Sequence, residues 1–405
     1  MSYDLNKYAD LKRIVKDNDY AKEKNLIVKE NGNLYLVKYD KSYLNINNYD
    51  TLGLFRSLIL DNDGNIVSYS PPKSYNLNID LNIDKFKFND FELQCFIEGT
   101  MINLFWHPYL QDWEVTTRSF IGARNKFDTT NTFRYMFLEC CNDCNLDFDK
   151  LDKNCCYSFV MQHKENRIVI PILKNTLIAV AIYDFSNGKV RIKDLNDFNS
   201  TVSTLFHSSV ITLNHTSLSL NNISKNIDSF KGLMNYVNSE DLDYKILGYV
   251  YYNKNNGYRM KIRNPNYETV RHLKGNTPKI QFQYYYLRKN DKVKEFLRFY
   301  PEYGSTFSKL RHDLHNWTNN LYQHYVKCFI LKEISLKNCP YEYKPHLYQL
   351  HKEYIDDLMV DKKYVTKRYV INYVNNLPPQ RLMYSVNHKL KKQQIDEEIA
   401  DVLNE

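Results

Sequence analysis

The pattern of apolar residues changes near residue 279, and this change most constrains the fold of the chain. From Leu34 to Thr277, short runs of β-branched and aromatic residues alternate with clusters of Asn, Asp and Gly, which is typical of strands joined by turns. Two stretches, 128–146 and 226–239, interrupt this pattern with helical periodicity. After Ile280, apolar residues recur at helical spacing and prolines separate the segments. The sequence therefore predicts an α+β domain of antiparallel sheets over 1–278 and an all-α domain over 279–405.

Several segments carry more specific predictions. Residues 1–30 predict a short helical lead, and Asp63-Gly64 predicts a hairpin turn. The most apolar segment, 168–185, is broken by a proline and a lysine and predicts two buried strands. The aromatic-basic segment 280–289 predicts a buried strand or an interdomain link rather than a base-stacking surface. The charge-rich tail after Lys389 predicts a solvated helix.

Composition places the chain among folded soluble proteins, with 43% hydrophobic and 25% charged residues. No run approaches the roughly 18 apolar residues of a membrane span, and the N-terminal segment has no apolar core of a signal peptide. We therefore expect a cytoplasmic protein with no membrane partner. The abundance of Asn, Lys, Ile and Tyr is typical of AT-rich genomes such as those of large DNA viruses, so the host cytoplasm or a virion is also an expected location.

The net charge of +8 is compatible with two interpretations. A positive excess favours binding to a polyanion such as RNA. A lysine-rich surface with no such partner explains the same number. The charge alone does not decide between them.

Five of the eight cysteines fall between residues 140 and 156. Cys141 and Cys144 form a Cys-x-x-Cys pair, with His163 downstream, and such a set could hold zinc. A second pair with the required spacing is missing from the sequence. Reduced thiols with a structural role are therefore the favoured interpretation, and we predict no metal site.

Five segments follow one another in an order that carries chemical meaning. They are RSLILDNDGNIVSYSPPKSYNL (56–77), FIEGTMINLFW (96–106), YSFVMQHKENRIVIPI (157–172), LGYVYY (247–252) and YRMKIRNPNY (258–267).

This series resembles the phage-type ATP-dependent RNA ligases, a branch of the covalent nucleotidyltransferases, over about 50–275. The resemblance implies an ATP-grasp-like nucleotidyltransferase domain, followed in many members by a helical domain. It also implies a reaction in which AMP passes from ATP to a lysine amine and then to an RNA 5′-phosphate. A nucleophilic amine, Mg²⁺ held by carboxylates and several cations would carry that chemistry. ATP and Mg²⁺ are therefore the expected cofactors of an active enzyme, and RNA the expected partner.

Part of the family's pattern is present. Glu98 and Gly99 match the acid and the glycine of the nucleophile motif, and Lys261 and Arg263 match the paired cations that grip the triphosphate. The resemblance assigns phosphate or nucleotide contacts to all four of these residues and to three further basic residues, which are Arg56, Arg118 and Arg167. Lys73 matches the lysine of the family's Pro-Lys segment. Each match also has a structural explanation. A glutamate-glycine pair is common in turns, and alternating cations are common on a solvated strand face.

Other positions depart from the pattern. The nucleophile slot holds Phe96, and the two carboxylate slots hold Ser158 and Leu247. Phenylalanine cannot attack a phosphate, and serine and leucine carry no carboxylate. The amine and both carboxylates of the family's pattern are therefore missing together. Lys73 lies on a neighbouring segment and could face the pocket as a substitute nucleophile.

Three hypotheses follow. The favoured one is a ligase-like protein that has lost its chemistry and binds a nucleotide or RNA ends, in short a pseudoenzyme. The first alternative is an active RNA ligase with a displaced lysine nucleophile. The second alternative is a structural or virion-associated protein.

Overall fold

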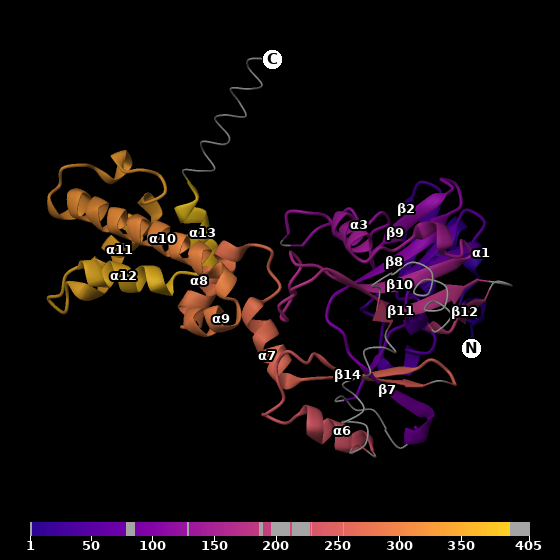
Figure 1. The fold of residues 1–405 in the computed structure, drawn as a ribbon. Helices are drawn as coiled ribbons and strands as arrows, with labels where there is room; N and C mark the ends of the chain where they lie inside the picture. Colours follow the sequence, from indigo (N-terminus) through magenta and orange to yellow (C-terminus); the bar gives the residue numbers. More distant parts are fainter. Residues whose placement is uncertain are drawn as a thin grey trace. The chain divides into compact units, whose positions relative to one another are not determined.

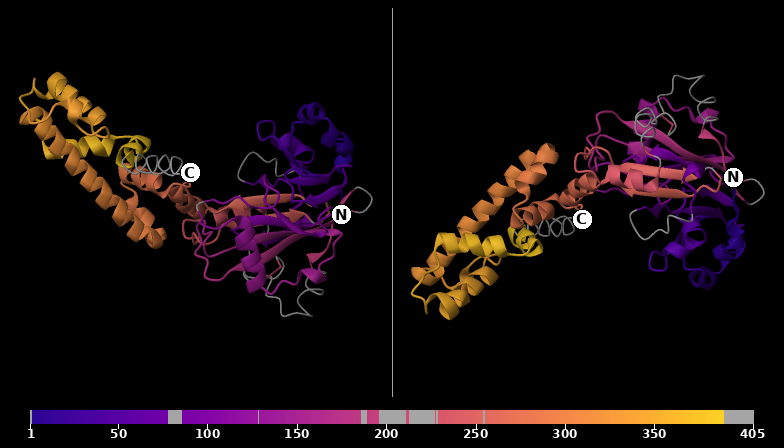
Figure 2. Two further views of the ribbon diagram at one scale, coloured as in Figure 1. Left: turned by 90° about the horizontal axis from the view of Figure 1, so that it is seen from above. Right: turned by 90° about the horizontal axis from the view of Figure 1, so that it is seen from below.

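A computed structural model describes residues 2–77, 86–127, 129–185, 189–195, 211–212, 227, 229–253 and 255–388 (Figures 1 and 2). The chain divides into two compact units, Met1–Arg271 and His272–Glu405. The boundary that the sequence predicts after residue 278 lies seven residues beyond this division and stays a prediction. Among the helices of the described residues, none is long and apolar enough to cross a membrane.

The first unit contains a small antiparallel sheet near its N-terminus. Its strands, in the order β2-β3-β4-β5, are β2 (Leu26–Asn31), β3 (Leu34–Tyr39), β4 (Leu58–Asp61) and β5 (Ile66–Tyr69). The short helices α1 (Leu11–Lys16) and α2 (Asn18–Glu23) precede it, each begun by an aspartate whose side chain accepts backbone N–H groups of the first turn. The predicted hairpin is confirmed, because β4 and β5 pair antiparallel around Gly64 at φ +77°.

A larger sheet forms the centre of the same unit. Its order is β1-β12-β11-β10-β8-β9, and β13 pairs parallel with β11. The strands are β1 (Ser2–Tyr3), β8 (Thr100–His107), β9 (Asp112–Thr116), β10 (Cys155–Gln162), β11 (Thr176–Asp184), β12 (Val190–Ile192) and β13 (Ile211–Thr212). Helix α3 (Phe133–Asp143) lies against this sheet, and its buried side chains share a core with those of β8 and β10 (Figure 1).

A third sheet forms a separate layer beneath the large one (Figure 1). Its order is β6-β15-β14-β7, with strands β6 (Tyr75–Asn76), β7 (Phe91–Cys95), β14 (Gly248–Asn253) and β15 (Arg259–Arg263). Helix α6 (Phe230–Val237) covers the face that points away from the large sheet. Helix α7 (Pro265–Lys274) starts directly after β15.

The described part of the second unit contains helices and no strands. Two of the helices continue into single π-helical turns at Val326–Ile330 and Tyr354–Leu358. The α-helices are α8 (Ile280–Lys289), α9 (Val293–Phe299), α10 (Gly304–Tyr325), α11 (Lys344–Glu353), α12 (Lys367–Asn376) and α13 (Pro379–Val386).

Two predictions of strands are wrong. Of the two strands predicted over 168–185 only β11 forms, because the backbone N–H groups of Val169 and Ile170 donate to a glutamate side chain instead of to a neighbouring strand. Segment 280–289 is helix α8, in which Tyr284 and Leu287 are buried three residues apart on one face. The tail predicted as a helix after Lys389 lies outside the described residues.

Candidate phosphate-binding site

Strand β15 separates its cations from its apolar residues. Successive side chains of a strand point to opposite faces. Met260 and Ile262 belong to the core that α6 completes, so Arg259, Lys261 and Arg263 share the other face of the strand, and Arg259 lies within electrostatic range of Tyr183 on β11 of the large sheet. Three cations in a row on an inward face need an explanation, because burial of charge is costly.

Lys261 lies in the middle of this row and is surrounded by other cations. Burial, and then the charges of Lys73, Arg263, Arg56 and Arg259, lower its pKa from 10.5 to about 7. Its ammonium has no hydrogen bond or ion pair with any residue that the structure describes. At neutral pH this side chain is therefore close to half protonated, and an anion beside it would restore the charge.

Arg56, just before β4, contributes a second cation from a different sheet. Burial, and then the charges of Arg259 and Arg118, lower its pKa to about 10. Arg118 lies beside it, with its Nε 3.5 Å from the Arg56 carbonyl oxygen and its guanidinium 4.9 Å from the Tyr39 ring centroid. Within the described part of the chain, Arg56, Arg118 and Arg259 form no ion pair.

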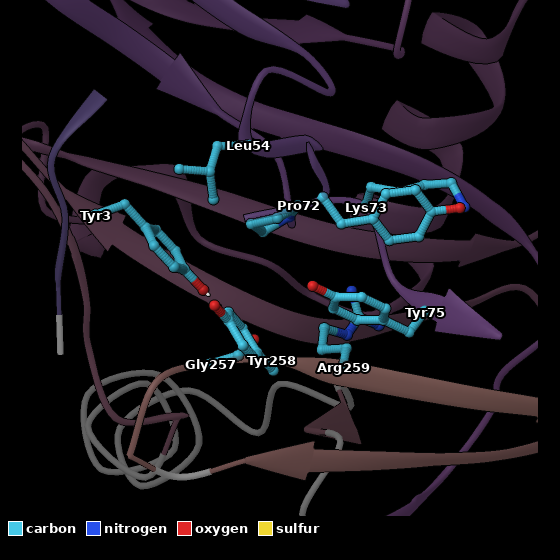
Figure 3. Close-up of a pocket in the computed structure, with 9 residues that line it drawn as sticks. Tyr3, Leu54, Pro72, Lys73, Tyr75, Gly257, Tyr258 and Arg259 are labelled. Atoms are coloured by element: carbon cyan, nitrogen blue, oxygen red, sulfur yellow. Dashed lines mark hydrogen bonds between the residues drawn. The ribbon is translucent and has the colours of Figure 1, made fainter. Parts of the chain in front are cut away.

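Lys73 completes the group. Its Nζ donates to the Tyr49 hydroxyl at 3.0 Å and to the Ser74 carbonyl at 3.3 Å, and it lies 4.5 Å from the Tyr49 ring centroid. All these partners are neutral. Lys73 and Arg259 both line a small pocket of about 10 Å³ (Figure 3). We call Arg56, Lys73, Arg259 and Lys261 the cation cluster.

Arg263 differs from the cluster because its charge is already compensated. Its Nη1 is 2.5 Å from the Glu268 carboxylate, on the first turns of α7. Its guanidinium also lies 5.4 Å from the ring centroid of Phe96. The predicted nucleophile slot therefore holds a phenyl ring in contact range of a paired arginine. The Phe96 N–H donates to the carbonyl of Gly248 at 2.9 Å, which fixes this slot against β14.

Glu98, Gly99 and Arg167 form a second group. The Glu98 carboxylate accepts hydrogen bonds from the backbone N–H groups of Val169 and Ile170 at 3.1–3.2 Å, and burial raises its pKa. Gly99 has φ +152°, and a Cβ there would be 2.5 Å from the Met161 carbonyl oxygen. Arg167 Nε donates to the Val169 carbonyl at 3.0 Å. These contacts hold segment 167–170 against the start of β8, and any contact of the three residues with a nucleotide stays a prediction.

The two positions where the family has metal-binding carboxylates hold other residues. The Ser158 hydroxyl donates to the Asn103 side-chain oxygen at 2.8 Å, and Leu247 is buried beside Gly248. Among the described residues, no three His, Cys, Asp or Glu side chains are grouped so that they could hold a metal ion. Cys141 and Cys144 are therefore not part of such a group. Ser158 and Leu247 offer no carboxylate to the Mg²⁺ that the resemblance implies, whereas the cations of the cluster are groups that bind phosphate oxygens.

The structure thus brings together most of the basic residues that the sequence singled out. Arg56, Lys73 and Lys261 lie in one cluster, and Arg118 and Arg263 lie at its edges. Arg259 was missed, although the Arg-x-Lys-x-Arg alternation at 259–263 places it on the same strand face as Lys261.

No family model matches the sequence, and no curated protein matches it. Solved structures with some similarity are ATP-dependent RNA and DNA ligases. Two are forms 1 and 2 of an archaeal ATP-dependent RNA ligase, each with a TM-score of 0.38 and 10% identity. The first match covers 70% of this chain and 68% of the ligase, and the second 65% and 62%. A third is a protein from Aquifex aeolicus described as a candidate ATP-dependent DNA ligase, with a TM-score of 0.33, 12% identity and coverage of 84% and 79%. Scores this low carry no argument about the function of this chain.

Proposed function

We propose that the first unit is an RNA ligase-like protein of nucleotidyltransferase fold that binds the phosphates of a nucleotide or an RNA end and transfers no nucleotide. One observation carries the proposal. The four side chains of the cation cluster converge from β15, from the segment before β4 and from the segment before β6, and no carboxylate among the described residues pairs with them.

The free-energy cost of placing several cations together in a partly buried site explains why such a cluster indicates a ligand. A partly buried cation loses hydration, and nearby cations add repulsion, so both effects oppose folding. The pKa of Lys261, lowered to about 7 by burial and by the neighbouring cations, is consistent with this cost. A phosphate placed among the cations would supply charge-assisted hydrogen bonds and remove the repulsion. We infer from this cost that an anion occupies the site when the protein functions.

We infer the absence of nucleotidyl transfer from three side chains. Phe96 has no nucleophilic atom, and Ser158 and Leu247 offer no carboxylate for a metal ion. The hydroxyl of Ser158 is buried against Asn103. Phosphate binding therefore needs only groups that are present, whereas nucleotidyl transfer needs groups that the family's positions lack.

Titration with ATP and with a 5′-phosphorylated RNA oligonucleotide tests the proposal. Lys261→Ala and Arg259→Ala are each expected to weaken binding about tenfold and to reduce its salt dependence. Lys231→Ala is the matched control, because Lys231 is an exposed lysine on α6, on the other side of the same sheet. Equal affinities for all four proteins would refute phosphate binding at the cluster.

A second candidate is nucleotidyl transfer by a displaced lysine. The lowered pKa of Lys261 favours it, since part of this side chain is an unprotonated amine at neutral pH. Lys73, beside it, is the substitute that the sequence suggests. Incubation with radiolabelled ATP and Mg²⁺ decides between the two candidates. A covalent protein-AMP adduct that disappears in Lys261→Arg or Lys73→Arg would overturn the proposal of pure binding.

A structural role without nucleic-acid affinity is the third candidate. It predicts that neither ATP nor RNA binds to the folded protein at low salt. The same titration tests it, and a measured affinity that depends on Lys261 would exclude it.

A further inference from the structure

A second group of cations lies at the edge of the small sheet. Lys29 on β2 and Lys38 on β3 share one face of this sheet, because Lys38 lies opposite Ile27 and Lys29 is two residues further along the strand. Lys38 lies within electrostatic range of Lys29, Arg118 and Lys41, all of them basic. We call Lys29, Lys38, Lys41 and Arg118 the outer basic group.

The segment after β9 packs against this group through neutral contacts. The Lys38 Nζ donates to the Ser119 hydroxyl at 3.0 Å, and the Lys29 Nζ lies 5.6 Å from the ring centroid of Phe120. The Arg118 guanidinium lies over the Tyr39 ring. No member of the group forms an ion pair with any residue that the structure describes. Lysines on an edge strand such as β2 also prevent unwanted strand pairing, but that role requires neither a half-buried lysine on β3 nor an arginine beside it.

Arg118 connects the outer basic group to the cation cluster. Its Nε lies 3.5 Å from the Arg56 carbonyl oxygen, and its charge acts on both Arg56 and Lys38. Arg56 in turn acts on Lys261. Positive charge therefore continues from β15 through Arg56 and Arg118 to the edge of the small sheet. A series of cations on several elements suits a polymer whose negative charges repeat along its length.

An exposed aromatic ring indicates which polymer this surface fits. Phe120 is 50% exposed and lies beside Lys29. A base can stack on such a ring, whereas an acidic side chain gains nothing from it. Cations that follow a backbone, together with exposed aromatic rings, are typical of surfaces that bind single-stranded nucleic acids. The stacked bases of a duplex do not offer their faces to a side chain, so the ring favours a single strand.

We propose that the outer basic group binds the backbone of a single-stranded nucleic acid whose terminal phosphate lies at the cation cluster. The proposal rests on phosphate binding at that cluster and extends the ligand from an end group to a strand. In this complex Lys29, Lys38 and Arg118 contact phosphates of the strand, and Phe120 stacks on one of its bases. Phosphate contacts carry no sequence information, so affinity depends on strand length and salt rather than on sequence.

Titration of the full-length protein with ATP and with a 5′-phosphorylated RNA of about 12 nucleotides, at several salt concentrations, tests the proposal. The double variant Lys29→Ala/Lys38→Ala is expected to bind the RNA about tenfold more weakly. The slope of log affinity against log salt is expected to fall by about 1.4, because each phosphate contact to a single strand contributes about 0.7. ATP affinity is expected to stay unchanged, since ATP needs only the cation cluster. The same titration with DNA of the same sequence distinguishes RNA from DNA as the strand, because both carry the phosphates that the cations contact.

Two further double variants separate the local contacts from folding and from net charge. Lys29→Arg/Lys38→Arg keeps both charges and is expected to keep the RNA affinity. Lys231→Ala/Lys245→Ala removes two exposed lysines elsewhere in the same unit and is expected to change RNA binding little. Phe120→Leu is expected to weaken RNA binding by at least about fivefold without changing the salt slope.

Separate results would overturn the strand surface and the phosphate site. Unchanged RNA affinity and salt slope in Lys29→Ala/Lys38→Ala, while Lys261→Ala still weakens ATP binding, would overturn the strand surface alone. An equal loss in Lys231→Ala/Lys245→Ala would also overturn it, since net charge would then explain the effect. Polyglutamate of equal charge that binds as tightly as the RNA would assign the surface to an acidic protein instead. Failure of both ATP and RNA to bind would refute the phosphate site itself.

Discussion

The titration of Lys261 gives the sharpest test of the cation cluster. In the folded protein its pKa is lowered to about 7, by burial first and then by Lys73, Arg263, Arg56 and Arg259. Arginine does not titrate between pH 6 and pH 8, and lysine does so only when its pKa is lowered this far. If a ligand binds only the charged form of Lys261, the lysine must therefore take up a proton when that ligand binds above pH 7.

The size of the effect follows from this pKa. A lysine with a pKa of 7 is about nine-tenths protonated at pH 6 and about one-tenth protonated at pH 8. If the ligand binds only the protonated form, its affinity falls about tenfold between these two pH values. The same lowered pKa determines how the free energy of unfolding changes with pH. The folded pKa lies below the unfolded value of 10.5, so the charged lysine destabilises the folded state most below pH 7. That cost disappears as the pH rises from about 7 to about 10.5, and it amounts to a few kcal/mol at most for a partly exposed side chain.

Isothermal titration calorimetry with ATP at pH 6, 7 and 8 measures the effect, and repetition in buffers of different ionisation enthalpy counts the protons taken up. Lys261→Arg is the matched variant, because arginine keeps the charge and does not titrate in this range. The γ-phosphate of ATP also titrates near pH 6, but it does so equally for both proteins. The difference between their pH profiles therefore belongs to Lys261. Lys261→Met removes the charge and is expected to raise the free energy of unfolding at pH 6.

Identical pH profiles for the wild-type protein and Lys261→Arg would refute this reasoning. They would mean that Lys261 is fully charged in the free protein, or that the ligand does not contact it. Unchanged stability of Lys261→Met at pH 6 would separate these explanations, since it would show that the charge costs nothing in the folded protein.

The remaining predictions concern the neighbours of the cluster. Arg263→Ala is expected to weaken ATP binding less than Lys261→Ala in the same titration, because Glu268 already compensates the arginine, and an equal loss would contradict this. Gly99→Ala is expected to lower the free energy of unfolding by about 2–4 kcal/mol in urea, because its Cβ would overlap a carbonyl, whereas Gly304→Ala, with no atom within 4 Å of its Cβ, should be neutral or slightly stabilising. Glu98→Gln is expected to cost about 2 kcal/mol of stability, since it replaces charge-assisted bonds to two backbone N–H groups, and to leave ATP affinity unchanged. A loss of ATP affinity in Glu98→Gln without loss of stability would instead place Glu98 in the ligand site.

The sequence predicted those features that depend on local patterns. The hairpin at Gly64 and the helices α3 and α6 follow from turn residues and from apolar periodicity. The strand predicted after Arg167 fails for a reason that no local pattern contains. Its backbone N–H groups are satisfied by Glu98, which is distant in the sequence. Segment 280–289 fails because its apolar and aromatic residues are compatible with both periods over such a short stretch.

The site was predicted in the same uneven way. Motif order identified Lys73, Lys261 and Arg56, which converge in the structure. Motif order could not show that Arg263 pairs with Glu268 or that Arg259 pairs with no carboxylate among the described residues, because both facts depend on tertiary contacts. How strongly a cation attracts an anionic ligand depends on the groups that already pair with it. The spacing of residues along a strand does not reveal those groups.

The ion pair between Arg263 and Glu268 also gives Phe96 a physical context. An arginine beside a lysine nucleophile would repel its protonated form and favour the free amine. With phenylalanine in that position there is no amine to activate, and Arg263 instead lies near a ring face and pairs with Glu268. The charge of Arg263, at the end of β15 near Phe96, is thus compensated by Glu268, whereas Lys261 and Arg259 pair with no carboxylate among the described residues. We therefore expect a phosphate ligand to depend more on Lys261 and Arg259 than on Arg263.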